Sequence, residues 1–465
     1  MINQDTIVAL ATPSGAGAIA VIRLSGNDAI KIADSCFKSV ISKKTLRNQK
    51  SHTIHLGHII DGKRTIDEVL VSVFKNPNSY TGEDVVEVSC HGSNYIQQEI
   101  IQLFLRQGSR MATAGEFTLR AFLNAKLDLS QAEAVADLIS SDNEASHQIA
   151  MQQMRGGFSS EIAKLREELL NFASLIELEL DFAEEDVEFA DRTQFKDLVE
   201  RIRFVLKRLI DSFAVGNVIK NGIPVAIVGE PNVGKSTLLN TLLNEERAIV
   251  SEIAGTTRDT IEDEISIGGI GFRFIDTAGI RETKDVVESI GIKKTFEKID
   301  QAQVIVFIAD STNFKDESFV HSFKIEVEKI KNKYPLKPLL IIANKVDKLN
   351  ENQIEFVKKD IPEIHLLSAK HGIGVEELKD KLLSFVNTGA LRNNDTIVTN
   401  SRHYDSLLKA FEEIEKVKDG LDTGLSGDLL AIDIRQALYH FGEITGEITN
   451  DDLLGNIFAN FCIGK

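Results

Sequence analysis

The sequence is poor in cysteine, with only Cys36, Cys90 and Cys462 among 465 residues. Zinc sites and disulfide frameworks need cysteines at short, regular spacings, which these three do not have. The sequence also lacks the run of about 20 apolar residues that a membrane-spanning helix needs. Its start, MINQDTIVALATPSG, holds neither a basic leader nor a long apolar core, so we expect no secretory signal. These absences favour a protein of the reducing cytoplasm that does not enter a membrane.

An excess of positive charge is missing too, because 53 Lys and Arg residues stand against 70 Asp and Glu residues, a formal net charge of −17. Non-specific coating of nucleic acid needs clustered basic side chains, so this charge argues against that class of protein. A local basic patch for one particular RNA is compatible with it. A candidate group is Lys196, Arg201, Arg203, Lys207 and Arg208, although a solvated helix face is the simpler interpretation.

The length and the hydrophobic periodicity predict several domains. Runs rich in branched residues, IAVIRLSG, VLVSVF and VVEVS, predict a small α/β or α+β domain over 1–124. Apolar residues three and four apart predict long helices over 125–217 and 388–465. Between these, PVAIVG, FRFID, VIVFIAD and LLIIAN alternate with helical or loop sequence, which predicts a parallel sheet with helices on both faces over 218–387. We therefore expect an α/β plus α chain, with an α/β domain inserted into a helical domain.

The first strand of the α/β segment runs into GEPNVGKST, which satisfies G-x-x-x-x-G-K-[ST] at Gly229, Gly234, Lys235 and Ser236. Glycines let backbone amides curl around phosphate oxygens. Lys235 supplies a charge to the β- and γ-phosphates, and the Ser236 hydroxyl can ligate magnesium. A glycine-rich turn is the alternative, but the expected strand before the motif and the helix after it favour a phosphate-binding loop.

Two later segments predict the parts that sense the γ-phosphate. AGTTRD fits a first switch segment, in which Thr256 or Thr257 would complete the magnesium shell. FRFIDTAG places Asp276 at a strand end, where it can hold that shell through water, and Gly279, whose amide can contact the γ-phosphate. Because these contacts require GTP, they predict a conformational switch on hydrolysis.

Two further segments predict recognition of guanine. In NKVD, the Asp347 carboxylate can accept the ring and exocyclic N–H groups of guanine, a pattern that adenine cannot offer, so an ATPase is disfavoured. Asn344 supports this loop, the stem of Lys345 can cover the base, and the SAK segment at 368–370 can contact the guanine O6 by a backbone amide. The predicted GTP site comprises Asn232, Val233, Gly234, Lys235, Ser236, Thr237, Ser251, Glu252, Ile253, Ala254, Gly255, Thr256, Thr257, Asp276, Thr277, Ala278, Gly279, Asn344, Lys345, Val346, Asp347, Ser368, Ala369 and Lys370.

The group that orients the attacking water is left open by the spacing. Ile280 follows DTAG, and an isoleucine cannot orient water as the glutamine of Ras-like GTPases does. The acidic candidates downstream are Glu282, Asp285 and Glu288. Arg258 and Arg281 are candidates for a charge-compensating arginine, although solvated loop residues are the simpler interpretation.

Motifs along the whole chain carry a resemblance. The GTPase motifs resemble the Era-type branch of translation-associated GTPases. With one phosphate loop and an internal GTPase segment, however, the chain differs from double GTPases and from Era itself. DTIVALATP, SYTGEDVVEVSCHG, GEFTLRAFLNAKLDLSQAEAVADLI and the terminal FCIGK are similar to the MnmE (TrmE) family. A regulatory GTPase that binds ribosomes is the alternative function, and these motifs disfavour it.

The resemblance implies a V-shaped homodimer whose GTPase domains pair when GTP is bound. It implies an N-terminal domain for dimerisation and for 5-formyltetrahydrofolate or another one-carbon tetrahydrofolate. It also implies a flavoprotein partner of the MnmG (GidA) type, in a heterotetramer or larger assembly. The two proteins would install aminomethyl or carboxymethylaminomethyl groups at C5 of the wobble uridine, position 34, of certain tRNAs.

The resemblance also assigns roles to residues. Glu288, in VVESIG, matches the glutamate that orients water, and Thr257 matches a magnesium ligand beside Ser236. Asn232 matches an asparagine that helps bind potassium, in place of an arginine finger. The remaining potassium positions are Ser251, Ile253 and Thr256, and the folate positions are Arg23, Glu87, Lys126 and Lys465. Cys462, in FCIGK, is a candidate site residue without an assigned role.

Overall fold

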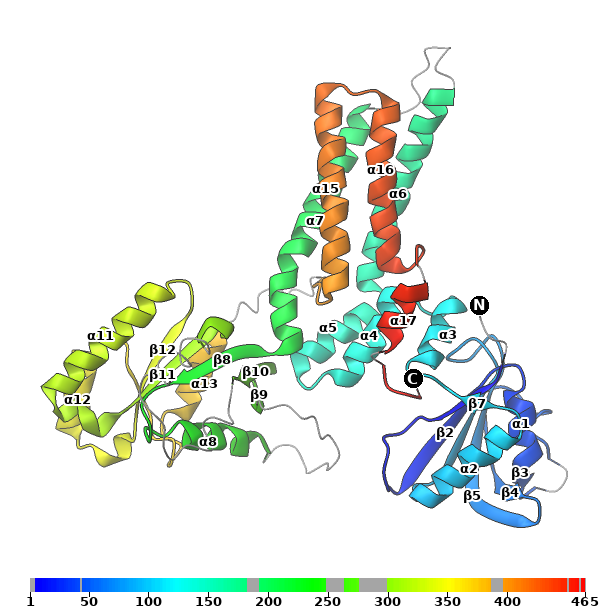
Figure 1. Cartoon of the computed structure of the whole chain (residues 1–465), viewed down its shortest axis with the longest axis horizontal. Helices are drawn as coiled ribbons and strands as arrows, with labels where there is room; N and C mark the ends of the chain where they lie inside the picture. Colours follow the sequence, from blue (N-terminus) through cyan, green and yellow to red (C-terminus); the bar gives the residue numbers. More distant parts are fainter. Residues whose placement is uncertain are drawn as a thin grey trace. The chain divides into compact units, whose positions relative to one another are not determined.

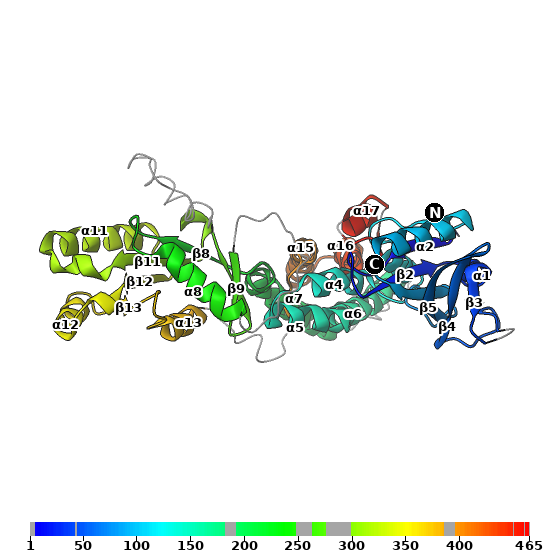
Figure 2. The same cartoon turned by 90° about the horizontal axis from the view of Figure 1, so that it is seen from below.

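The structure, a computed structural model, describes residues 5–41, 44–181, 192–247, 263–275, 299–385, 396–449, 451–459 and 461–464. The chain divides into two compact units (Figure 1, and Figure 2 for the view from below). Unit 1 comprises 1–140, 150–207 and 405–465, and unit 2 comprises 141–149 and 208–404. No helix in the described part of the chain is both long enough and apolar enough to cross a membrane.

Unit 1 contains a seven-stranded sheet in the order β3-β4-β5-β6-β2-β1-β7. Neighbouring strands are antiparallel except β1 and β7, which are parallel. The strands are β1 (Ile7–Leu10), β2 (Ile19–Ser25), β3 (Phe37–Ser39), β4 (Thr53–Asp61), β5 (Arg64–Phe74), β6 (Val85–His91) and β7 (Arg110–Met111). Alternate residues of the strands pack against α1 (Ala29–Cys36) and α2 (Asn94–Arg106), so that one face of the sheet forms the core.

The other elements described in unit 1 are helices. They are α3 (Glu116–Leu123), α4 (Leu129–Ser140), α6 (Gly157–Asp181), α16 (Gly427–Thr445) and α17 (Asp451–Ala459), with parts of α5 (Glu144–Met154), α7 (Arg192–Asn221) and α15 (Ser401–Thr423). The predicted periodicity is confirmed in α6, where Ile162, Leu165, Leu169 and Ile176 are at most 5% exposed. This apolar face packs alongside α16 (Figure 1).

Unit 2 contains a six-stranded sheet in the order β13-β12-β11-β8-β10-β9. All neighbours are parallel except β9 and β10, which form an antiparallel pair at one edge. The strands are β8 (Ile223–Val228), β9 (Asp263–Ile267), β10 (Ile270–Phe274), β11 (Val304–Asp310), β12 (Leu339–Asn344) and β13 (His365–Leu366).

Helices cover both faces of this sheet, as predicted. Along β11, Val304, Val306 and Ile308 pack on the side of α8 (Lys235–Arg247) and α13 (Val375–Ser384). The intervening residues of β11 pack on the side of α11 (Glu317–Lys333) and α12 (Glu351–Asp360). Burial on both faces explains why VIVFIAD is a continuous apolar run rather than an alternating one. The carboxyl ends of the parallel strands meet at one edge, where such sheets bind ligands.

Candidate functional site

The loop between β8 and α8 approaches its neighbours so closely that it depends on two glycines. Gly229 has φ 151° and Gly234 has φ 103°, which side chains rarely permit. A Cβ on Gly229 would overlap the Ile308 carbonyl oxygen, and one on Gly234 would overlap Nδ2 of Asn344. Because α8 begins directly after this loop, at Lys235, the positive end of the helix dipole favours an anion beside the loop.

The lysine and the serine of the same loop lie at the start of α8. Nζ of Lys235 donates hydrogen bonds to the carbonyl oxygens of Gly229 (2.8 Å) and Glu230 (2.7 Å). The ammonium group therefore links the start of α8 to the first residues of the glycine-rich loop. Ser236 is half-buried beside it and Thr237 is exposed. This places a cation and a hydroxyl where phosphates and a divalent ion would meet the loop.

Asn344, the last residue of β12, joins three loops through one buried carboxamide. It is 2% exposed. Its Nδ2 donates to the Val233 carbonyl at 2.8 Å, and its Oδ1 accepts from the Ala369 amide at 2.9 Å. The Thr241 hydroxyl of α8 donates to the Ala369 carbonyl at 2.7 Å. The glycine-rich loop, the NKVD loop and the SAK loop are therefore held together.

Asp347 lies in a short 3-10 helix, η3 (Val346–Lys348), beside the SAK loop. Its Oδ1 accepts a hydrogen bond from the Ser368 hydroxyl at 2.5 Å, and Nε2 of His371 lies 3.7 Å from its Oδ2. The bond from Ser368 lowers the pKa of Asp347 below its ordinary value. The carboxyl group therefore stays ionised at neutral pH and can accept further N–H donors. Lys370 follows Ala369 and is exposed.

Asp310, at the end of β11, is a residue of this edge that sequence reasoning missed. Its carboxylate accepts a hydrogen bond from Nζ of Lys345 at 2.6 Å. The same Nζ donates to the carbonyl oxygen of Asn232 at 2.7 Å. The available signal was an acidic residue at the end of the apolar run VIVFIAD, the position at which a parallel strand reaches the ligand-binding edge.

Several predicted site residues lie outside the described part of the chain. They are Ser251, Glu252, Ile253, Ala254, Gly255, Thr256, Thr257, Asp276, Thr277, Ala278, Gly279, Glu288 and Lys465. Among the described residues, no group of three His, Cys, Asp or Glu side chains could hold a metal ion.

The three predicted folate positions that the structure describes lie on β2, on β6 and just after α3, all in unit 1. Arg23 and Glu87 form an ion pair, with Nε and NH2 of Arg23 at 2.8 and 2.7 Å from Oε1 of Glu87. The guanidinium carbon lies 5.5 and 5.6 Å from the ring centroids of Tyr80 and Phe117. Tyr80 stands in the SYTGED motif, and nothing in the sequence alone singles out its ring.

Two further segments approach this group. NH1 of Arg23 donates to the Gly464 carbonyl at 3.4 Å, next to the predicted position Lys465. A Cβ on Gly82, two residues after Tyr80, would lie 3.4 Å from Cγ of Lys126. Arg23 and Glu87 are thus in direct contact, and the stem of Lys126 reaches the loop that carries Tyr80.

A network of charged side chains, centred on the buried Arg120, joins the segments that carry this region and was not predicted. Arg120, with a side chain that is 4% exposed, bonds to Asp5, Glu83 and Glu116 at 2.9–3.0 Å. Burial by itself raises the pKa of Glu116, but hydrogen bonds from Arg110, the Thr113 amide and Arg120 outweigh it and lower the pKa to about 2. Glu83 also accepts from Ser25, so the network ties α3 to the loop of Tyr80 and to β2.

The three cysteines differ in exposure. Cys36 and Cys90 are buried, and burial raises the pKa of both thiols, that of Cys90 to about 11. They are therefore protonated and unreactive at neutral pH. Cys462 is exposed, and its carbonyl oxygen accepts from the Gly115 amide at 3.4 Å. The adjacent Ile463 forms a β-bridge with Ala114.

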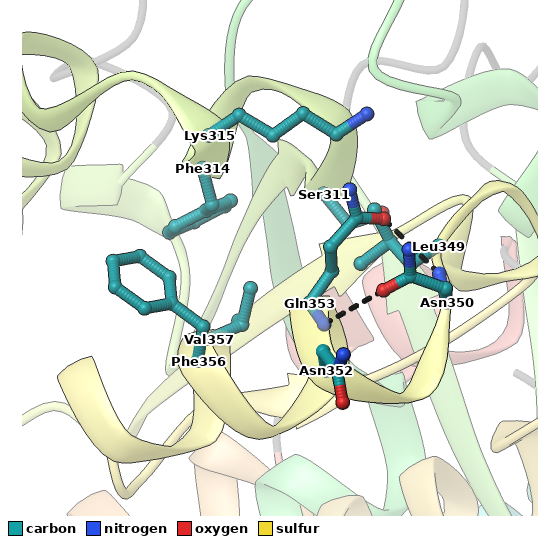
Figure 3. A pocket seen from close by; sticks show the side chains of 9 residues that line it. All are labelled: Ser311, Phe314, Lys315, Leu349, Asn350, Asn352, Gln353, Phe356 and Val357. Atoms are coloured by element: carbon teal, nitrogen blue, oxygen red, sulfur yellow. Dashed lines mark hydrogen bonds between the residues drawn. The ribbon is translucent and has the colours of Figure 1, made fainter.

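A pocket of about 330 Å³ lies between α12 and a 3-10 helix, η2 (Ser311–Lys315) (Figure 3). The rings of Phe314 and Phe356 lie on one side of it, and Gln353 and Asn350 are hydrogen-bonded to each other on the other. Its other lining residues are Ser311, Lys315, Leu349, Asn352 and Val357. None of the predicted site residues lines it, although Ser311 directly follows Asp310 and Leu349 directly follows η3.

Comparisons with known proteins cover nearly the whole chain. A family model described as "GTP-binding protein TrmE N-terminus" matches residues 6–126, and one described as "MnmE helical domain" matches 129–462. A protein of Flavobacterium psychrophilum named tRNA modification GTPase MnmE is 78% identical over 100% of both chains. Proteins of the same name from Flavobacterium johnsoniae and Christiangramia forsetii are 77% and 75% identical, over 100% and 99% of both chains.

Similarity to solved structures is much weaker. A GTP-binding protein from the hyperthermophilic archaeon Sulfolobus solfataricus, in complex with GDP, matches 49% of this chain and 67% of that chain. The identity is 21% and the TM-score is 0.26, which is too low to carry an argument.

Proposed function

The chain belongs to the MnmE family of tRNA modification GTPases, and we propose how its residues serve that activity. It is a GTP hydrolase that acts in tRNA modification. Its proposed reaction, with a flavoprotein partner of the MnmG type, modifies C5 of the wobble uridine of certain tRNAs in the cytoplasm. The product carries an aminomethyl or carboxymethylaminomethyl group.

The convergence of three loops on Asn344 supports the GTP site most strongly. The glycine-rich loop provides backbone amides for phosphate, and the SAK loop lies against the ionised carboxyl group of Asp347. In the proposed complex, Asp347 accepts two N–H groups of guanine, and Nζ of Lys235 turns from its carbonyl acceptors to the phosphates. The move of Lys235 replaces hydrogen bonds within the chain by bonds to the nucleotide, which limits the cost of removing water from its ammonium group.

Hydrolysis is proposed to occur by in-line attack of water on the γ-phosphorus. The bond from water oxygen to phosphorus forms while the bond to the β–γ bridging oxygen breaks, which leaves GDP and phosphate. Glu288 orients the water. Ser236 and Thr257 hold magnesium, and Asn232 with Ser251, Ile253 and Thr256 holds potassium. The oxygens of Ser236 and Asn232 suit hard cations. Bound cations supply positive charge that stabilises the developing negative charge.

The folate site is proposed around the Arg23–Glu87 pair. A carboxylate suits the N–H groups of a pterin edge, and a basic side chain suits the glutamate tail. Arg23, Lys126 and Lys465 provide the basic groups. The ring of Tyr80, which already lies near the guanidinium of Arg23 and is 37% exposed, offers flat apolar surface beside them. A bound one-carbon tetrahydrofolate would supply the carbon unit of the modification.

The proposed architecture has four segments: an N-terminal folate-binding and dimerisation domain at 1–124, a helical domain at 125–217 and 388–465, and a GTPase domain at 218–387. The position of unit 2 between parts of unit 1 in the chain supports an inserted domain. Homodimerisation, pairing of the GTPase domains and assembly with the flavoprotein belong to the same proposal.

The first test measures GTP turnover by the purified full-length protein in potassium and in sodium at matched ionic strength. We expect rapid turnover in potassium alone, and its loss in Glu288→Ala while GDP affinity is kept. Glu282→Ala serves as the matched control and should retain turnover. Turnover indifferent to the cation would remove the potassium role of Asn232, and an active Glu288→Ala would remove the role of Glu288.

The second test addresses the tRNA. Mass spectrometry of tRNA from a strain without the gene should show wobble uridines that lack the C5 group, while ribosome subunit profiles stay normal. Modified uridines together with abnormal subunit profiles would contradict the proposed reaction and favour a ribosome-binding GTPase.

A further inference from the structure

Lys345 of the guanine loop is held between two parts of the ligand-binding edge. Its Nζ donates to Oδ2 of Asp310 at 2.6 Å and to the carbonyl oxygen of Asn232 at 2.7 Å. The side chains of Asp310 and Lys345 are 16% and 26% exposed, so water screens the ion pair only partly. The end of β11 is thereby linked to the glycine-rich loop through a side chain of the loop after β12.

The other oxygen of Asp310 anchors the carboxylate. Oδ1 accepts from the Thr312 amide at 3.0 Å and from the Thr312 hydroxyl at 2.7 Å, which caps η2. Burial raises the pKa of Asp310, but the bonds from Lys345 and Thr312 outweigh it, and the pKa lies below its ordinary value. The carboxylate is therefore ionised at neutral pH, and one of its oxygens fixes the side chain while the second holds the ammonium group of Lys345.

The link acts on the backbone of the glycine-rich loop at Asn232, which has a positive φ. Asn232 has φ 63° and Lys345 has φ 68°, so both residues are in the left-handed region, which residues other than glycine rarely adopt and which asparagine tolerates better than lysine. The bond from Lys345 fixes the Asn232 carbonyl oxygen. Because the peptide group is planar and trans, it also fixes the direction of the Val233 N–H.

We propose that Asp310 is a positioning residue for GTP hydrolysis, which holds Lys345 so that the Asn232–Val233 peptide keeps the orientation required for nucleotide and cation. The cation part rests on the proposed role of Asn232 in binding potassium. The nucleotide part requires only the GTPase activity of the family. Asp310 thereby couples the guanine loop to the phosphate loop through Lys345.

A purely structural role, in which Asp310 only caps η2, predicts a different outcome. Asp316 provides the matched control, because it caps α11 through the same pair of bonds, to the amide and hydroxyl of Ser318 at 2.9 and 2.8 Å. Within the described residues Asp316 has no lysine partner. Asparagine is also a favoured cap, so Asp310→Asn and Asp316→Asn both keep the cap, and only the first removes the charge facing Lys345.

The experiment uses the full-length protein and measures two quantities for each variant. These are the dissociation constant of a fluorescent GDP analogue and the potassium concentration for half-maximal GTP turnover at constant ionic strength. For Asp310→Asn we expect both to rise about tenfold, as for the loss of one charge-assisted hydrogen bond. Asp316→Asn should leave both unchanged. In a Lys345→Met background, Asp310→Asn should have little further effect, because the two side chains act through one contact.

The outcomes separate this proposal from the potassium site. Suppose that wild-type turnover depends on potassium. The positioning role is then wrong if Asp310→Asn leaves the potassium concentration for half-maximal turnover unchanged. It is also wrong if Asp316→Asn shifts that concentration equally. If wild-type turnover does not depend on potassium, the proposed cation site is wrong, and the GDP affinity of the variants then tests the link from Asp310 to the glycine-rich loop. A tenfold loss confined to Asp310→Asn then supports the link, and wild-type affinity overturns it. Thermal unfolding with GDP present confirms that each variant is folded.

Discussion

Replacing Asn344 with alanine tests whether one buried carboxamide organises the nucleotide site. The change removes the donor to the Val233 carbonyl and the acceptor of the Ala369 amide, with bond lengths of 2.8 and 2.9 Å. Val233 and Ala369 are 2% and 1% exposed, so water does not reach either group unless the loops move. We expect the glycine-rich loop and the SAK loop to separate and GDP to bind more weakly.

The free-energy cost of the substitution follows from the two lost hydrogen bonds. Each is worth about 1 kcal/mol net, or about 1–3 kcal/mol if its buried partner stays unpaired, so the total is about 2–6 kcal/mol. If the loops relax and regain water, the lower figure holds. The loops must then be reordered when nucleotide binds. The apparent dissociation constant therefore rises in inverse proportion to the fraction of molecules whose loops are already ordered for binding. About 2 kcal/mol corresponds to roughly 30-fold weaker binding.

The assay is a titration of the full-length protein with a fluorescent GDP analogue. Asn350→Ala is the matched control, because Asn350 caps α12 in the same unit through its bond to the Gln353 amide at 3.0 Å. Its loss costs about 1 kcal/mol of helix stability but leaves the loops joined. Binding within threefold of wild type by Asn344→Ala, or equal loss in Asn350→Ala, would refute the reasoning.

Two further predictions concern backbone space and pH. Gly234→Ala should weaken GDP binding in the same titration about as much as Asn344→Ala, because its Cβ overlaps the Asn344 amide; Gly108→Ala, also at φ 103° but in open space, should bind normally. Glu116, whose pKa falls from 4.5 to about 2 on folding, stabilises unit 1 fully above pH 4.5 and loses this stabilisation as the pH falls towards 2. The loss amounts to about 3 kcal/mol. Urea unfolding between pH 6 and pH 3 should therefore show a smaller pH dependence in Glu116→Gln, and an unchanged slope would contradict the low pKa.

The sequence alone determined the layout of the described elements. Apolar spacings of three and four marked the buried face of α6, and continuous branched runs marked β8, β11 and β12, because burial on one or both faces leaves a local pattern. The glycine-rich loop, NKVD and SAK were also recognisable one by one, since each function needs particular residue types a few positions apart. Their order on strand ends predicted a GTP-binding site.

The tertiary structure alone decided which side chains touch. Asn344 meets Val233 across 111 positions, Arg120 meets Asp5 across 115, and Lys345 meets Asp310 across 35. Such pairs leave no periodic trace, because a contact between distant residues depends on strand order and loop path rather than on neighbours in the chain. For the same reason Asp310 read as the last residue of a buried strand. Its importance emerges only when β11 and β12 lie side by side and bring its carboxylate to Lys345.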